Sequence, residues 1–176
     1  MIVCAGNIEQ FSFATPIGIG LVDSAINLSR LILMSPPQYL VFVGTAGSYG
    51  KKEIFEIVES RVASNIEHSF LNNTAYTPID NVVSASENVS RETIVNSSNY
   101  ITASKELSKR YLSLNIDLEN MEFFSVLKVA QEFNIPVAGI FVVTNYCYES
   151  AHEEFKKNHA KAMQLLDQYL RKKGLV

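Results

Sequence analysis

The chain has 176 residues, of which 47% are hydrophobic and 19% are charged, and its formal net charge is −3. This composition is ordinary for a globular protein and excludes an intrinsically disordered chain, and the length fits one domain spanning residues 1–176. Lysine and arginine are scattered along the chain, so nucleic acid and anionic membranes are not expected as partners. We expect a small-molecule ligand instead.

The N-terminus and the cysteines indicate the compartment. The first residues lack the pattern of a signal peptide, and no segment is apolar enough to span a membrane, so we expect a cytoplasmic protein. Cys4 and Cys147 have neither CxxC spacing nor histidine partners, which predicts reduced core thiols and no metal site. The three histidines are isolated in the sequence and are expected on the surface or on a helix face: His68, His152 and His159.

The first predicted elements are a short strand and a helix. Residues 12–20 read Ser-Phe-Ala-Thr-Pro-Ile-Gly-Ile-Gly, typical of an edge strand that closes on a Gly-x-Gly turn. An amphipathic helix should follow, with Asp23 or Ser24 as its cap, and should stop at Pro36. Residues at helical spacing predict the face that packs on the sheet: Val22, Ile26, Ser29 and Leu33.

Two continuous apolar runs predict central strands buried on both faces. They are residues 39–44, which end at the Thr-Ala-Gly of residues 45–47, and residues 135–143, which end at residues 144–145. Pro136 is tolerated because it stands at the start of its strand.

The middle of the chain is less regular. Residues 54–58 and 61–64 have mixed polarity and suit antiparallel or edge strands. Residues 72–98 are rich in Asn, Ser and Thr, a composition compatible with a loop, an oligomer contact or a short pair of strands. The sequence does not decide among these.

Three helices are predicted in the C-terminal half. The first covers residues 102–111, and the second covers residues 121–133, with Phe124, Leu127 and Ala130 on one face. The last begins at a capping box, Ser150-Ala-His-Glu153, and reaches Lys172. Its apolar stripe consists of Phe155, Met163, Leu166 and Leu170.

Helices that alternate with buried strands predict an α/β fold, a three-layer α/β/α sandwich around a central mixed, mostly parallel sheet. Ligands of open α/β sheets bind beyond the carboxyl ends of the strands. We therefore expect the binding site at residues 44–47 and 144–145.

Three motifs occur in order along the chain. Pro16-Ile-Gly-Ile-Gly20 precedes a helix and then Val41-Phe-Val-Gly-Thr-Ala-Gly47; Asn120-Met-Glu122 opens a second helix; Thr144-Asn145 closes an apolar strand. Together they resemble the nucleoside phosphorylase superfamily, which includes purine nucleoside phosphorylases, methylthioadenosine/adenosylhomocysteine nucleosidases and futalosine hydrolases. The resemblance runs from Ile17 to the C-terminal helix. It implies no cofactor, apart from phosphate as a co-substrate if the reaction is phosphorolysis.

The resemblance implies a site made of Thr45, Ala46, Gly47, Tyr100, Ile101, Met121, Glu122 and Asn145. Glu122 would accept hydrogen bonds from both ribose hydroxyls, and Met121 would lie against the apolar face of the sugar. Tyr100, beside Ile101, would stack on the base, and the loop at Thr45 would form the floor near C1′. The alternatives are structural: a solvated first-turn glutamate, a core methionine, a loop tyrosine packed on the core, and a tight turn without a ligand.

Asn145 bears most directly on the chemistry. A departing purine needs a proton or a hydrogen bond at N7, and an amide supplies only the hydrogen bond. Its NH₂ and C=O together match N7 and O6 of a 6-oxopurine, so the resemblance to Asn-bearing phosphorylases implies inosine-, guanosine- or futalosine-like substrates.

The chain also departs from the family pattern. Phe141 stands near the position where the methylthioadenosine nucleosidases carry a supporting arginine, and no arginine flanks the glycine motifs to hold phosphate. The helix usual after the first strand is compressed into residues 7–10, where Glu9 would correspond to the family's water-activating acid.

We therefore expect cleavage of the N-glycosidic bond of a 6-oxopurine nucleoside, with Glu122 and Asn145 as catalytic residues. Phosphorolysis and hydrolysis both stay open: the asparagine favours comparison with phosphorylases, and the missing arginines favour water. The alternatives are a non-catalytic purine-nucleoside-binding protein with a degenerate site and a scaffold without a ligand. Members of the family usually form dimers or larger oligomers. The resemblance therefore implies a homodimer or larger homo-oligomer, formed through the helix after Gly20 and residues 72–98.

Overall fold

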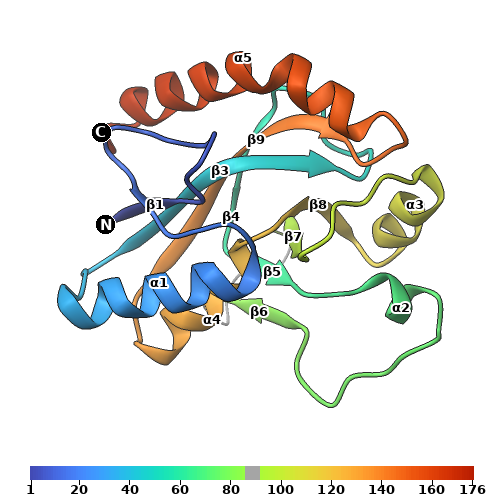
Figure 1. The fold of residues 1–176 in the computed structure, drawn as a ribbon, viewed down its shortest axis with the longest axis horizontal. Helices are drawn as coiled ribbons and strands as arrows, with labels where there is room; N and C mark the ends of the chain where they lie inside the picture. Colours follow the sequence, from blue (N-terminus) through green and yellow to red (C-terminus); the bar gives the residue numbers. More distant parts are fainter. Residues whose placement is uncertain (86–91) are drawn as a thin grey trace.

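The structure is a computed structural model that describes residues 1–85 and 92–176 (Figure 1). The strands within these ranges are β1 (Ile2–Cys4), β2 (Thr15–Pro16), β3 (Leu40–Ser48), β4 (Ile57–Ser60), β5 (Val62–Ser64), β6 (Val82–Ser84), β7 (Ile94–Ser97), β8 (Ile116–Asn120) and β9 (Val137–Tyr146). The helices are α1 (Gly20–Met34), α2 (His68–Leu71), α3 (Lys105–Ser113), α4 (Phe123–Glu132) and α5 (Ala151–Lys172).

The strands form one mixed sheet. Its main path runs β2-β1-β3-β8-β7-β5-β6, and β9 joins the sheet by pairing with both β3 and β4. Most pairs are parallel, whereas β3 with β8, β4 with β9 and β5 with β6 are antiparallel. The predicted α/β class with a mixed, mostly parallel sheet is therefore confirmed.

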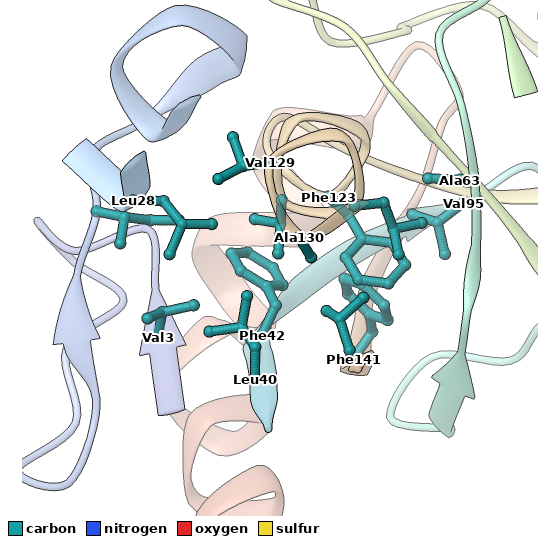
Figure 2. Close-up of a cluster of buried hydrophobic side chains, with 14 of the residues drawn as sticks. Val3, Leu28, Leu40, Phe42, Ala63, Val95, Phe123, Val129, Ala130 and Phe141 are labelled. Atoms are coloured by element: carbon teal, nitrogen blue, oxygen red, sulfur yellow. The ribbon is translucent and has the colours of Figure 1, made fainter. Parts of the chain in front are cut away.

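Helices cover both faces of the sheet. In Figure 1, α5 lies along one face and α1 and α4 lie on the other. Leu166 and Leu170 of α5 pack on apolar residues of β3 and β9. On the opposite face, Phe42, Phe123 and Phe141 belong to a larger core beneath α4 (Figure 2). The three layers of the sandwich are α5, the sheet, and α1 with α4, and the two cores lie between them.

The two central strands are longer than their apolar runs. All nine residues of β3 are buried, and β3 continues through residues 45–47 with a register shift between Ala46 and Gly47. The prediction of a loop there is wrong, because parallel pairing with β9 holds the chain extended as far as Ser48. Thr144 and Asn145 likewise lie inside β9 and do not follow it.

Helix α1 has the expected position but differs in its cap and its buried face. Ile19 is the N-cap and makes no side-chain capping bond, so Asp23 and Ser24 both lie within the helix. The inward residues are Gly20, Ser24, Leu28 and Ile32, whereas the predicted Val22, Ile26 and Leu33 are 61%, 53% and 73% exposed. Ser24 can face inward because its hydroxyl donates to the Gly20 carbonyl at 2.6 Å.

Helix α5 reaches Lys172 as predicted, and Leu166 and Leu170 are buried. The capping box is not formed: the Ser150 hydroxyl donates to Glu154 at 2.7 Å and makes no capping bond to the backbone. No helix within residues 1–85 and 92–176 is both long and apolar enough to cross a membrane.

The remaining differences concern short strands. The sequence pattern indicated no strand at β1 or β8. Within residues 72–98, β6 and β7 are both strands, but each pairs with β5 and not with the other. The part of this segment at residues 86–91 lies outside the described residues.

Candidate active site

A pocket of about 500 Å³ lies where β3, β8 and β9 end, beside the first turn of α5. This volume is typical of a small-molecule site. The eight residues named from the sequence all line it: Thr45, Ala46, Gly47, Tyr100, Ile101, Met121, Glu122 and Asn145. The structure thus brings them together, and their roles remain predictions.

Glu122 is the N-cap of α4 and is 5% exposed, so it is not a solvated surface glutamate. Its Oε1 accepts a hydrogen bond from the Gly20 N–H at 3.0 Å, at the start of α1. Its Oε2 accepts from Asn120 Nδ2 at 3.1 Å and from the Met121 N–H at 3.2 Å. Burial raises the pKa of Glu122 to about 7, and the nearby Glu9 contributes to the rise.

Glu9 also lines the pocket and lies in the turn after β1. One carboxylate oxygen accepts from the Thr45 hydroxyl and the other from the Thr45 N–H at 3.2 Å. A Cβ on Gly44 would come within 2.8 Å of Glu9 Oε2, so the carboxylate can rest on β3 because residue 44 is glycine. Burial raises the pKa of Glu9, and the hydrogen bonds from Thr45 oppose the rise.

Asn145 is 6% exposed and its amide is oriented by neighbouring groups. Its Oδ1 accepts from the Thr144 hydroxyl at 2.8 Å, and its Nδ2 donates to the Tyr146 carbonyl at 3.1 Å. An amide nitrogen carries two hydrogens, so a second N–H is left for a ligand in the pocket.

Glu119 is a pocket residue that the sequence analysis missed. It is 6% exposed and stands on β8. Burial raises the pKa of its carboxyl group, and hydrogen bonds from Thr102 and Tyr49 partly oppose this rise. The period-two alternation of apolar and acidic residues over residues 116–119 is the signal that would have indicated this strand.

The mouth of the pocket is apolar. Tyr100 and Ile101 are 74% and 62% exposed, and Met121 is partly buried at the pocket wall and not in the core. Ile8, Ile19 and Phe155 complete this rim, and none of them was named as a site residue from the sequence. His152, predicted at the surface, is exposed and borders the pocket.

The position of the family's supporting arginine is part of the core. Phe141 is fully buried, with its ring centroid 5.1 Å from that of Phe123 and 5.8 Å from that of Phe42 (Figure 2). Among the described residues that line the pocket, none is lysine or arginine, whereas three are glutamates.

The structure defines a protein of the α/β sandwich class, with a pocket at the ends of its central strands and buried carboxylates on the pocket walls. Ligands of open α/β sheets bind at this position. The sequence pattern of the phosphorylase superfamily matches residues 2–172, so the chain belongs to that superfamily. The resemblance stated from the motifs is thereby confirmed. A comparison with curated proteins finds no match.

Solved structures share the fold at low sequence identity. A mutant of the Helicobacter pylori nucleosidase MTAN, with 5′-methylthioadenosine in its active site, has a TM-score of 0.81 and 18% identity; the match covers 97% of this chain and 95% of that one. Futalosine hydrolase of H. pylori has a TM-score of 0.80 and 19% identity, over 97% and 94%. The 5′-methylthioadenosine/S-adenosylhomocysteine nucleosidase of S. pneumoniae has a TM-score of 0.76 and 14% identity, over 96% and 95%.

Proposed function

We propose that this protein cleaves the N-glycosidic bond of a 6-oxopurine nucleoside and that water is the acceptor of the ribosyl group. The observation that carries the proposal is a pair of carboxylates, the buried Glu122 and the partly buried Glu9, on the walls of one pocket with Asn145. Membership of the phosphorylase superfamily supports bond cleavage of this type, and the similar structures include nucleosidases and a hydrolase.

Glu122 in its ionised form is suited to bind the ribose diol, because a carboxylate accepts hydrogen bonds from two neighbouring hydroxyls. These bonds strengthen as the ring gains oxocarbenium character, so they lower the barrier as well as bind the sugar. The Asn145 N–H that is free of protein partners would donate to the departing base, which takes the electron pair of the broken bond.

Glu9 is suited to activate water. Thr45 holds both of its oxygens in place, next to the strand segment that would form the floor beneath C1′. The water oxygen would bond to C1′ as the bond to N9 breaks, and its proton would pass to Glu9. Three glutamates on the pocket wall repel a phosphate dianion, which favours water over phosphate as the acceptor.

The test is incubation with inosine, guanosine and futalosine, with and without phosphate. We expect release of the base at the same rate in both conditions, together with the free sugar. Glu9→Gln should lower kcat by about 10²- to 10⁴-fold, the usual contribution of a general base, while a thermal-shift titration still detects binding.

The possible outcomes separate the alternatives. Ribose 1-phosphate formed strictly in the presence of phosphate would overturn water as the acceptor and leave phosphorolysis. Thermal stabilisation by nucleosides without release of base would refute catalysis and leave a binding protein, and no stabilisation would leave a scaffold.

We also propose that two copies of the chain associate through α1. Its outward face is apolar, with Ile26 and Leu33 53% and 73% exposed, and Ile19 at the start of the helix lies both on this side and in the pocket rim. Exposed apolar surface beside a ligand site is typical of an interface between protein chains. A symmetric homodimer would cover it.

A further inference from the structure

His159 lies on the stripe of α5 that faces the sheet. It follows Phe155, which lines the pocket, by one helical turn and precedes Ala162, which belongs to the core between α5 and the sheet, by another. Residues three and four positions apart share one face of a helix. The ring centroids of Phe155 and His159 are 5.0 Å apart. His159 is therefore placed behind the rim of the pocket, at the edge of the core beneath α5.

The imidazole of His159 contains a buried nitrogen that lacks a partner. Its Nε2 is buried and makes no hydrogen bond to the residues that the structure describes, 1–85 and 92–176. Buried polar atoms are nearly always hydrogen-bonded, so this one requires an explanation. The neighbouring Asn158 is bonded, because its Nδ2 donates to the Thr144 carbonyl at 2.9 Å. That bond ties this turn of α5 to the pocket end of β9.

The carboxylate of Glu9 reaches the same side of the sheet. Val41, Val43 and Thr45 alternate along β3, and side chains two residues apart in a strand point to one face. Val41 and Val43 belong to the core beneath α5, so the Thr45 hydroxyl points to the side that α5 covers (Figure 1). This hydroxyl donates to Glu9. One oxygen of Glu9 is therefore held on the side of His159.

The charge of His159 acts on Glu9. Burial raises the pKa of Glu9, and the hydrogen bonds from Thr45 and the positive charge of His159 oppose the rise. Because Nε2 has no bonded partner among the described residues, this attraction acts through space, and it is screened less inside a protein than in water. The described pocket wall contains neither lysine nor arginine that could replace it.

We infer that His159 is a positioning residue whose imidazolium keeps Glu9 ionised, so that Glu9 can take the proton of the attacking water. This inference rests on the proposed function and deepens it. An ionised carboxylate has a lone pair for that proton, whereas a neutral one does not. The imidazolium also explains why a nitrogen without a hydrogen-bond partner is retained beneath α5, since its charge is balanced by a nearby carboxylate.

The first test uses His159→Gln, which keeps a side-chain N–H and removes the charge. With inosine as substrate, kcat should fall by about 3- to 10-fold at pH 6. At pH 9 it should stay within about twofold of the wild type, because a histidine is ordinarily neutral there and a glutamate ionised. KM should not change at either pH, since Glu9 is not assigned to the sugar. A merely structural role would lower kcat equally at both pH values.

The other titratable groups that face Glu9 are Glu122 and Cys4. They are common to the wild type and His159→Gln, so the ratio of the two rates isolates His159. Lys157→Gln is the matched control, because it removes one positive charge from the exposed side of the same helix. It should follow the wild type at both pH values.

Two further variants test whether the charge acts through Glu9. His159→Arg keeps a positive charge and should retain at least about half of the wild-type kcat at pH 6. In a Glu9→Gln background, His159→Gln should cause no further loss of kcat, because the group on which the charge acts is gone.

A measurement without substrate separates this inference from the proposed function. In a carboxyl ¹³C NMR titration, with the Glu9 signal assigned from Glu9→Gln, the pKa of Glu9 should be higher in His159→Gln than in the wild type and not higher in His159→Arg. If no nucleoside is cleaved, the proposed function fails, and this titration alone decides the role of His159.

Three results would overturn that role while cleavage stands. They are an equal loss of kcat at pH 6 and pH 9 in His159→Gln, a further loss in the Glu9→Gln background, and a pKa of Glu9 that is unchanged in His159→Gln or raised in His159→Arg.

Discussion

Replacing Glu122 with glutamine should make the stability of the protein less dependent on pH. In the folded chain the pKa of Glu122 is about 7, compared with an ordinary value of 4.5. Between these pH values the unfolded chain loses this proton while the folded chain keeps it, so rising pH favours unfolding. The stabilisation by the neutral form is complete below about pH 4.5 and is lost as the pH rises through 7. It amounts to about 3 kcal/mol.

The assay is urea denaturation of the wild type and Glu122→Gln at intervals from pH 4.5 to 8.5. The wild-type free energy of unfolding should fall by about 3 kcal/mol more than that of the variant across this range, because the other buried carboxylates are common to both proteins. Glu132→Gln, at an exposed position of the same helix, is the control and should follow the wild type. Parallel curves for the wild type and Glu122→Gln would refute the reasoning.

Three further predictions concern packing, association and the general base. Gly139→Ala would place a Cβ 2.5 Å from Phe141, so the free energy of unfolding should fall by about 1–3 kcal/mol in a thermal unfolding experiment. An unchanged Tm would contradict this packing. Light scattering should show a homodimer for the wild type and a monomer for Ile26→Lys, and the free energy of unfolding should change by less than about 0.5 kcal/mol. A monomeric wild type would rule out the association. Thr45→Val removes a hydrogen bond that favours ionised Glu9, so the acid limb of kcat should move to higher pH, and an unmoved limb would argue against Glu9 as the base.

The central strands and the last helix could be predicted because their patterns are long and their burial is unambiguous. Residues 39–44 and 135–143 are apolar without interruption, and both lie in strands buried at the centre of the sheet. The buried face of α1 could not be predicted in the same way. Val22, Ile26 and Leu33 recur at helical spacing and were predicted to face the sheet, but the buried set is Ser24, Leu28 and Ile32. Ser24 can face inward because its hydroxyl is hydrogen-bonded within the helix itself.

The pocket was located from the sequence because three motifs end strands or begin helices at one edge of the sheet. The alternation over residues 116–119 could have indicated the strand of Glu119, but its place at the pocket depends on the antiparallel pairing of that strand with β3. The placement of Glu9 depends on the turn after β1 and on the missing side chain of Gly44. Such contacts between distant segments leave no periodic signal in a single sequence, so the resemblance indicated Glu9 and the residue pattern did not.

The hydrogen bond from the Gly20 N–H to Glu122 ties the first turn of α1 to the same carboxylate that faces the pocket. One side chain therefore serves two tasks, since it anchors a helix and is available to a ligand. Loss of function after a mutation at this position has two separate explanations, a loosened helix or a lost ligand contact. The Gly20 amide itself reports which one applies, because its hydrogen exchange accelerates in the first case and stays slow in the second.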